Sequence, residues 1–370
     1  MKKITTLALA CLTLTCTWAQ TVKSNGYEFT IKNQAKCTSV KNQEKTGTCW
    51  CYAGTSFLES EVMRTKNLNI DLSEMFGVRY TYANKAEQYV RYQGKTNFGE
   101  GGLSHDAINA LKNYGVMPQV AFEGRKDGGI YNHAELSKSL EKQIKEVVSS
   151  KKITPNYLDA VNETLNAEIG TPPTEFLFNS QKYTPKSFAR ELGLDATNYV
   201  SLTSYTHHPF YENFVLEIPD NFSHGSFYNL PLGEFTAAID AALEAGYTVS
   251  WDADVSNEGF NFNEGMALLP AEDEKKPFKK PCIELTVTQQ SRQQAFDEQS
   301  ATDDHLMHIV GIANDQKGRP YYIVKNSWGE TNDQKGYLYC SKPYFEMNTI
   351  SVLLNKNALN TETKNKLGIK

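Results

Sequence analysis

Cys49 stands in the stretch KNQEKTGTCWCYAG, where a polar, turn-forming run changes to a helical pattern. A cysteine attacks a carbonyl carbon as a thiolate, which a helix N-terminus and a neighbouring imidazolium both stabilise. The stretch TDDHLMHIVG supplies two candidate imidazoles, His305 and His308. Residues three apart in a strand point to opposite faces, so only one of them can serve the site. We predict that His305 does so and that His308 is structural or exposed.

A histidine base needs a partner that fixes its tautomer. Asn326 ends an apolar strand in YYIVKNSWGE, and this strand is expected to pair with the His305 strand across the turn NDQKGR. The Asn326 side-chain carbonyl can then accept the second ring N–H of His305, and Trp328 can shield that bond from water. Gln43, six residues before Cys49, offers an amide donor that, with the Cys49 backbone N–H, would stabilise an oxyanion.

These residues require a helix that carries the thiol and strands that carry the base. Apolar residues at helical spacing predict helices over 49–65 and 71–92, with Ser73 as a candidate N-cap, and 98–118 is a glycine-rich turn into a third helix. We interpret the charged region 125–200 as a mostly helical insertion. A helix over 233–246 precedes a buried strand, and the last third consists of short apolar or alternating runs between turns. The pattern predicts an α+β fold with two lobes.

Composition excludes some partners. The chain has 370 residues, 40% of them hydrophobic, which is enough for a substantial core. Its net charge is −5, with an isoelectric point near 5.9. Without a basic patch, nucleic acid and anionic membrane surfaces are not expected as partners.

Residues 1–19 have the pattern of a secretory signal. Lys2 and Lys3 precede an apolar run, and Ala19 lies at a plausible cleavage site before Gln20. The apolar run is shorter than the roughly 20 residues that a spanning helix needs. We therefore expect a protein exported to the periplasm or secreted, without membrane attachment after cleavage. A membrane anchor, or a lipid anchor on a cysteine of this segment (Cys11 or Cys16), is the alternative.

Several other polar and thiol side chains have a simpler interpretation. Cleavage would leave five cysteines, an odd number that requires at least one free thiol: Cys37, Cys49, Cys51, Cys282 and Cys340. We expect Cys51 to be a packing residue, and whether the other three are free or bridged is open. Asp303 and Asp304 are expected to be solvated. His207 and His208 could ligate a metal, but a lone pair in a loop favours a structural role.

The motifs KNQEKTGTCWCYA, DDHLMHIVG and VKNSWGE resemble, in the same order, the Gln, Cys, His and Asn motifs of papain-like cysteine peptidases. The stretch GGLSHDAINALKNYGVMP is similar to the glycine-rich strand of that family. The resemblance implies that Gly101 and Gly102 line the acyl-side subsites and places Trp328 at the substrate site. It also implies a helical lobe with the cysteine helix and an antiparallel, barrel-like β lobe with His305 and Asn326.

Within that family the bleomycin hydrolase/aminopeptidase C branch is most similar, through YNLPLGEFTAAIDAALEAGYTVSWDADV. Cys49 and His305 are 256 residues apart, against about 130–150 in simple papain-like enzymes. The helical insertion accounts for most of the excess, so we expect one peptidase domain over 20–358 and a short polar tail over 359–370.

Two departures from the pattern matter. The tail NTETKNKLGIK is shorter than the C-terminal arm that fills the cleft in this branch, which leaves strict aminopeptidase action open. Thr46 also stands where papain has a disulfide-forming cysteine.

The predicted function is an exported thiol peptidase with a Cys49–His305–Asn326 triad, of the aminopeptidase type. An endopeptidase or amide hydrolase without N-terminal restriction is the alternative. A non-catalytic or zinc-stabilised protein, with the metal on the two C-x-C cysteines and the two H-x-x-H histidines, is a third possibility that strand geometry disfavours. Peptides are the expected partners, no metal or organic cofactor is implied, and a homo-oligomer is possible.

Overall fold

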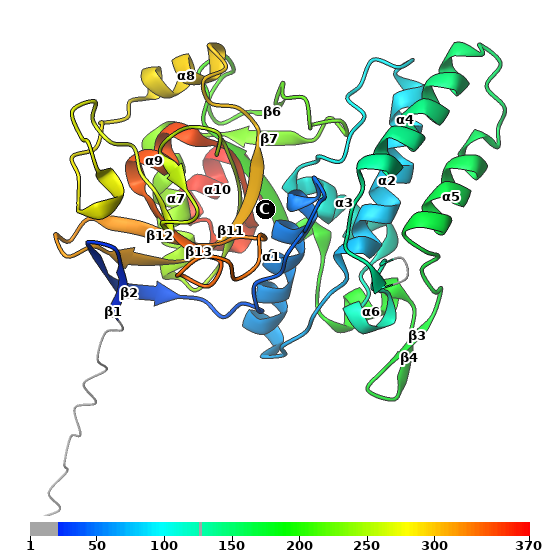
Figure 1. The fold of residues 1–370 in the computed structure, drawn as a ribbon, viewed down its shortest axis with the longest axis horizontal. Coiled ribbons are helices and arrows are strands. Elements are labelled where there is room, and N and C mark those ends of the chain that lie inside the picture. Colours follow the sequence, from blue (N-terminus) through cyan, green and yellow to red (C-terminus); the bar gives the residue numbers. More distant parts are fainter. Residues whose placement is uncertain (1–20, 126–127) are drawn as a thin grey trace, which may run out of the picture.

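The computed structural model describes residues 21–125 and 128–370. Two lobes lie side by side, with helix α1 (Cys49–Lys66) between them (Figure 1). The predicted signal segment falls outside the described residues. None of the described helices is both long and apolar enough to cross a membrane.

The helical lobe follows the predicted order. Helix α2 (Glu74–Arg91) begins at Ser73, whose hydroxyl accepts the Phe76 N–H as an N-cap. Helix α3 (Ser104–Tyr114) ends at Gly115, which has a positive φ of 90°. Helices α4 (Ala134–Ser149) and α5 (Tyr157–Glu168) pack on each other and on α2. The insertion also contains α6 (Pro185–Glu191) and a hairpin of β3 (Phe176–Phe178) and β4 (Gln181–Tyr183), which was not predicted.

The β lobe is built on one sheet with the order β6-β7-β5-β14-β8-β11-β12-β13-β10-β9, in which β2 also pairs with β11 and with β1. Its strands are β1 (Thr21–Ser24), β2 (Tyr27–Gln34), β5 (Tyr199–Thr203), β6 (Asn213–Val215), β7 (Ser226–Asn229), β8 (Val249–Ala253), β9 (Phe260–Asn261), β10 (Met266–Ala267), β11 (His305–Asn314), β12 (Pro320–Lys325), β13 (Tyr337–Ser341) and β14 (Thr349–Asn355). The predicted antiparallel pairing of the His305 strand with the Asn326 strand is confirmed, since β11 pairs with β12.

Helices α7 (Leu232–Glu244) and α9 (Lys342–Asn348) pack on this sheet, and α8 (Gln289–Asp297) packs on α9. Apolar residues of α7, α9 and the central strands form one core cluster, with Trp251 and Phe345 among its members. A second cluster joins α1 to the rest of the helical lobe and reaches the sheet through Leu306 and Leu353. The two lobes therefore meet along α1, with the start of β11 on its other side.

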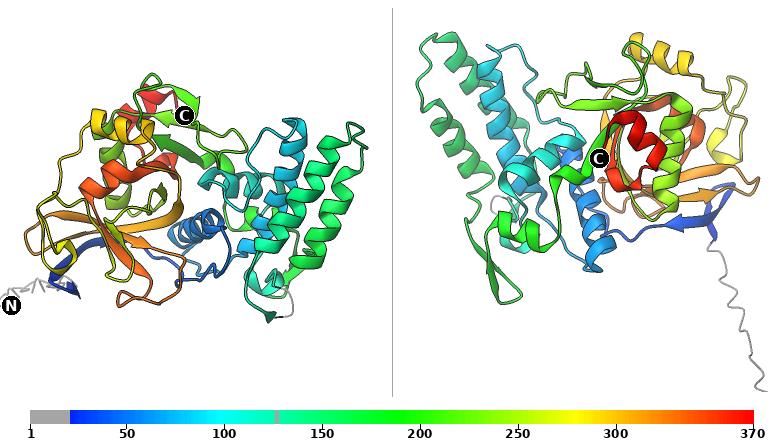
Figure 2. Two further views of the ribbon diagram at one scale, coloured as in Figure 1. Left: turned by 45° about the horizontal axis from the view of Figure 1, so that its top comes forward. Right: turned by 180° about the vertical axis from the view of Figure 1, so that it is seen from behind.

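The C-terminal segment is helical. Helix α10 (Thr361–Leu367) buries Leu367 in the β-lobe core, and Lys366 pairs with Glu234 of α7 at 3.0 Å. Seen from behind, α10 lies beside α7 (Figure 2). Asn355, just before this segment, donates to Glu61 in the fourth turn of α1. The segment thus docks on the β lobe, and Asn355 before it contacts α1 about three turns along the helix from Cys49.

Candidate active site

Cys49 is the first residue of α1, as the sequence pattern predicted. Two hydrogen bonds join the start of this helix to Glu100 of the neighbouring glycine-rich segment. The Gly47 N–H donates to Glu100 Oε2 at 2.7 Å, and the Trp50 indole N–H donates to the Glu100 carbonyl at 3.0 Å. Cys49 is 7% exposed, so its side chain is largely buried.

His305 and Asn326 lie at the ends of the paired strands β11 and β12. His305 Nε2 is 2.7 Å from Asn326 Oδ1, the hydrogen bond that the sequence predicted. The Trp328 ring stacks on the imidazole with 4.6 Å between centroids, which shields this bond from water. His308 points to the other side of the strand, where its Nδ1 is 2.9 Å from Ser56 Oγ of α1.

A short antiparallel pairing brings Gln43 to the histidine lobe. The Gln43 N–H donates to the Ser327 carbonyl at 2.8 Å, and the Gly329 N–H donates to the Lys41 carbonyl at 3.0 Å. The side-chain amide is also held, because Ser327 Oγ donates to its oxygen at 2.6 Å and its nitrogen donates to the Thr46 carbonyl at 2.7 Å. An amide nitrogen carries two hydrogens, so one N–H remains for a ligand.

The Cys49 sulfur lies at the start of β11. The backbone N–H of Leu306, the residue after His305, points at Cys49 Sγ. Because Asn326 engages His305 Nε2, Nδ1 is the ring nitrogen left to exchange a proton with a thiol. Burial raises the pKa of the Cys49 thiol to about 12 and lowers the pKa of His305 to about 4. A lone thiolate or a lone imidazolium is therefore disfavoured here, and an ion pair of the two avoids an isolated buried charge.

A buried polar network behind the site holds α1 against the β lobe. Lys325, at the end of β12, donates to Thr38 Oγ1 at 2.9 Å and to Ser56 Oγ at 2.8 Å. Glu59 of α1 is 1% exposed and accepts the Leu72 N–H at 2.8 Å and the Thr38 hydroxyl. Its carboxylate also lies 3.6 Å from Lys41 Nζ. Polar groups thus connect the two lobes directly behind the catalytic candidates.

The glycine-rich segment lies next to the cysteine helix. A Cβ on Gly102 would come 3.2 Å from the Trp50 ring, so the backbone of this residue packs on the indole. A Cβ on Gly101 would overlap the Asp220 carboxylate, so this carboxylate lies directly on the glycine backbone. The Lys85 ammonium donates to the carbonyl oxygens of Gly99 and Gly101. One of the two predicted subsite glycines, Gly102, therefore packs on the residue after Cys49, and the other, Gly101, is covered by an aspartate from another part of the chain.

The prediction that Asp303 is solvated is wrong. Its side chain is only partly exposed, and it faces the carboxyl of Asp252, which is completely buried in β8. Asp303 lies outside β11, which begins at His305, and it is covered only by segments distant in sequence. Asp304 is exposed, as expected, and accepts the backbone N–H groups of Val255 and Ser256.

The remaining thiols are all free: Cys37, Cys51, Cys282 and Cys340. The Cys51 sulfur donates to the Glu74 carbonyl at 3.2 Å, and burial raises its pKa, as befits a packing residue. His308 is bound to Ser56 and His305 to Asn326. The cysteine and histidine pairs of the zinc alternative thus point to different partners.

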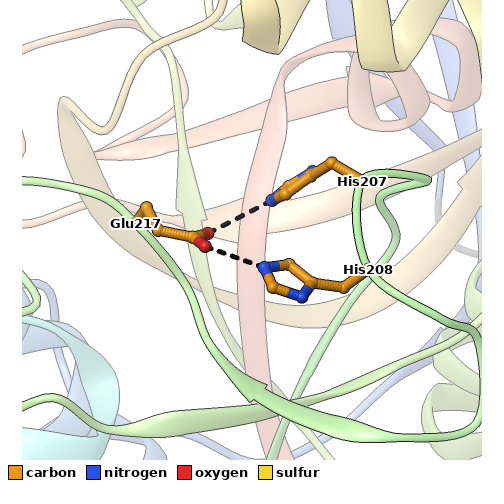
Figure 3. Close-up of side chains that lie close together, drawn as sticks. All are labelled: His207, His208 and Glu217. Carbon is orange, nitrogen blue, oxygen red and sulfur yellow. Dashed lines mark hydrogen bonds and ion pairs between the residues drawn. The ribbon is translucent and has the colours of Figure 1, made fainter.

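His207 and His208 meet a third side chain, Glu217. Their Nε2 atoms lie 3.2 and 2.7 Å from its two carboxylate oxygens (Figure 3). Two imidazoles and a carboxylate are a donor set that suits zinc. Here, however, the carboxylate itself satisfies both ring nitrogens, and the rings stack on Phe296 and Phe214. The cluster, which sequence reasoning saw only as a histidine pair, ties Glu217 to the β lobe.

Comparison with known proteins decides the family. The sequence model of the Peptidase C1-like family matches residues 6–369. The chain belongs to the Peptidase C1-like family. The predicted relation to papain-like cysteine peptidases of the bleomycin hydrolase/aminopeptidase C branch is thereby confirmed, and the chain is a cysteine peptidase.

Curated members of this C1-like group are similar to the chain along most of their length. "Aminopeptidase C" of Streptococcus thermophilus is 23% identical over 87% of this chain and 81% of its own length. "Bleomycin hydrolase" of Homo sapiens is 22% identical over 86% of this chain and 80% of its own length. Among solved structures, PepW from Lactobacillus rhamnosis superposes with a TM-score of 0.75 at 20% identity, covering 92% of this chain and 84% of that one. The predicted α+β papain-like fold is confirmed.

Two aspartates beside the candidate active site were not singled out by the sequence analysis. Asp252 interrupts the apolar strand in VSWDADV, and an acid in a run that reads as buried was a usable signal. Asp220 lies in the β6–β7 connection and had no local signal, since only the fold brings that segment to Gly101.

Proposed function

We propose that this chain hydrolyses peptide bonds through Cys49, His305, Asn326 and Gln43, and that it acts as an aminopeptidase. One observation carries the proposal. The hydrogen bond of 2.7 Å from His305 to Asn326 lies at the start of β11, where the next backbone N–H faces the Cys49 sulfur. A nucleophile, a base and an orienting amide thus come together from three separate parts of the chain.

In the first half of the reaction, the Cys49 sulfur attacks the peptide carbonyl carbon while its proton passes to His305 Nδ1. The carbon–nitrogen bond then breaks as His305 returns that proton to the leaving amine, and a thioester remains. In the second half, His305 takes a proton from water, the hydroxide oxygen bonds to the acyl carbon, and the carbon–sulfur bond breaks. The acid product leaves, and the thiol regains its proton.

Three other groups assist these steps. The Asn326 oxygen holds the His305 ring so that Nδ1 faces the sulfur, and it stabilises the imidazolium that forms. The free N–H of Gln43 and the Cys49 backbone N–H would donate hydrogen bonds to the carbonyl oxygen and stabilise the negative charge that develops on it. The rigid anchoring of Gln43 by Ser327 and Thr46 preorganises this donor.

The aminopeptidase assignment has support in the names of the curated relatives, which are aminopeptidases and bleomycin hydrolase. An endopeptidase or amide hydrolase with the same triad would cleave N-blocked reporters as fast as free-amine reporters. A direct comparison of the two kinds of reporter distinguishes these activities.

The thiol is tested by substitution. We expect Cys49→Ala to reduce peptidase turnover by about 10⁴-fold or more, because the nucleophile of a triad carries most of the rate. Labelling by a thiol-directed epoxide should also vanish. Cys51→Ala is the matched control, since it removes a neighbouring buried thiol and should keep both readouts. Persistent turnover in Cys49→Ala with an unchanged melting temperature would contradict the assignment.

A further inference from the structure

The β6–β7 connection, residues 216–225, reaches from the β lobe to the helical lobe (Figure 1). On the helical side, Asn97 Nδ2 donates to Asp220 Oδ1 at 2.9 Å. Ser223 Oγ donates to Asp106 Oδ1 at 2.7 Å and lies 2.9 Å from His105 Nε2. On the β side, the Asp220 backbone N–H faces the Asp303 carboxyl, two residues before His305. The segment is thus attached to both walls of the cleft.

Three aspartates from separate elements meet where this segment crosses. Asp220 and Asp303 are partly exposed, and Asp252 lies completely buried behind them. Ser351 Oγ donates to Asp252 Oδ2 at 3.1 Å. Asp252 Oδ1 and Asp303 Oδ2 are buried and have no N–H or O–H donor from the described part of the chain. These two carboxyls face one another closely enough to share a proton.

The three aspartates lie near Gly101 and Gly102, the glycines next to the cysteine helix. Asp220 covers Gly101, and the adjacent Gly102 packs on the indole next to Cys49. The charges of Asp303, Asp220 and Asp252 all act against ionisation of the Cys49 thiol, so the carboxyls lie within electrostatic reach of it. A peptide that lies along Gly101 and Gly102 with its scissile carbonyl carbon at Cys49 would therefore have its N-terminal end near these aspartates.

The three carboxyls share one nearby ammonium in the described part of the chain, that of Lys85. This charge lies near Asp220 and opposes the effect of burial, which raises the pKa of the Asp220 carboxyl. Lys85 also donates to the carbonyl oxygens of Gly99 and Gly101. Asp252 Oδ1 and Asp303 Oδ2 receive no donor from the described residues besides the proton that they share. A ligand with several N–H groups and a positive charge therefore suits the exposed side of this acid group.

We propose that Asp303 and Asp220, with Asp252 behind them, bind the free α-ammonium group of a peptide substrate, and that residues 216–225 close the acyl end of the cleft. This inference rests on the proposed function, because it assumes that Cys49 receives the scissile carbonyl. It assigns N-terminal restriction to a loop and three aspartates of this chain. A lysine or arginine side chain presents similar donors, so the test must separate the backbone amine from a side chain.

A binding measurement tests this without turnover. In the full-length Cys49→Ala protein, Ala-Ala-amide should bind at least about tenfold more tightly than N-acetyl-Ala-Ala-amide, as expected for a charged hydrogen-bonded pair. Adding Asp303→Asn should remove most of that ratio. Adding Asp252→Asn instead should preserve it, because the new amide can still donate to Asp303 as a protonated carboxyl does. Equal binding of the two peptides, or an unchanged ratio with Asp303→Asn, would overturn the inference.

Turnover gives a second readout and separates this inference from the proposed function. Reporters with one- or two-residue acyl parts should be cleaved with a free amine and resist cleavage when N-acetylated, and Asp303→Asn and Asp220→Asn should narrow the difference. Equal cleavage of blocked and free reporters would overturn the inference while leaving the thiol mechanism intact. Selective cleavage of N-acetylated reporters with lysine or arginine would also overturn it. Loss of epoxide labelling and turnover in the unmodified chain would count against the proposed function alone, since the binding ratio does not depend on them.

Discussion

His305 and His308 occupy one strand, three residues apart, in different environments. Asn326 and Trp328 hold His305, whereas His308 bonds to Ser56 and lies beside the Lys325 ammonium. Burial lowers the pKa of His308 far below its usual value, and the lysine adds to this effect. An imidazole that stays neutral can serve as a fixed hydrogen-bonding group in the lobe interface. The alternation of side chains along a strand thus separates a proton-transfer role from a structural one.

The acid pair makes amine selectivity depend on pH. Burial raises the pKa of Asp303 to about 7, the charges of Asp220 and Asp304 add to this, and its hydrogen bond with Asp252 opposes it. Below that pH the Asp303 carboxyl is neutral, and above it a negative charge is present for an ammonium. Burial lowers the pKa of the Lys85 ammonium, and the charges of Asp220 and Asp106 oppose this effect.

We therefore expect the ratio of kcat/KM for free-amine over N-acetyl reporters to rise several-fold between pH 5.5 and 7.5. It should fall again as the substrate amine loses its proton, at a pKa of about 8. Titration of Cys49 and His305 affects both reporters and cancels in the ratio. Measuring the ratio for Asp303→Asn over the same range is the control, and the profile of that variant should be flat. A rise that survives this substitution would assign the titration to another group.

The proposed catalytic residues could be selected from the sequence, and the aspartate group could not. Gln43, Cys49, His305 and Asn326 lie in motifs whose local pattern shows both residue type and element. Asp220 and Asp303 differ from solvated surface acids only through contacts between segments distant in sequence. Burial of a polar residue through such contacts leaves no periodic signal in a single chain.

At the scale of elements, regular segments followed their patterns and connections did not. The predicted helices over 49–65 and 71–92 correspond to α1 and α2, and the hairpin of β11 and β12 formed as predicted. Their apolar periodicity matches the faces that they bury. The β3–β4 hairpin is a short pair of strands inside a region dominated by helical spacing. Strands of three residues carry too few side chains to show an alternation.

The junction of α1 with the β lobe depends on Glu59. We expect Glu59→Ala to lower the free energy of unfolding by about 3–5 kcal/mol, the range for removing one partner of a buried ion pair. The loss leaves the Leu72 N–H and the Thr38 hydroxyl without their acceptor and Lys325 without a compensating charge. Denaturant unfolding followed by tryptophan fluorescence measures the change.

Glu28→Ala is the matched control for this prediction. Glu28 pairs with Lys23 at 2.9 Å, but both side chains are at least half exposed. Pairs of this kind contribute about 1 kcal/mol or less. Equal losses from the two variants would show that the Glu59 network does not hold the lobes together.

At the scale of the whole molecule, the sequence indicated two lobes and an insertion between cysteine and histidine. The composition shift from helical to β-rich segments carried that information. The docking of α10 on α7 was not indicated, because a mostly polar segment was expected to be a tail. Two leucines of this segment, Leu359 and Leu367, are buried in the β-lobe core. Leu359 precedes the helix, which begins at Thr361, so the two leucines do not form a helical repeat in the sequence.

Export is a prediction for the whole chain. We expect expression of the full sequence in a secreting bacterial host to give a mature protein that begins at Gln20, because Thr17 and Ala19 match the small-residue rule of signal cleavage. Mass spectrometry of the N-terminal peptide from the exported fraction measures this. Ala19→Arg should block processing at that bond. An intact Met1 terminus on active protein in the cytoplasm would contradict the prediction.

The β6–β7 connection, residues 216–225, is held by Asn97 and Asp106 of the helical lobe and by Asp303 of the β lobe. A fixed barrier at one end of the substrate groove would set the number of residues that are removed from a polypeptide in each catalytic cycle. A long peptide would then be shortened in equal increments from one terminus, and a time course of its digestion would show a ladder instead of scattered internal fragments. Chemical capping of that terminus would protect the entire peptide.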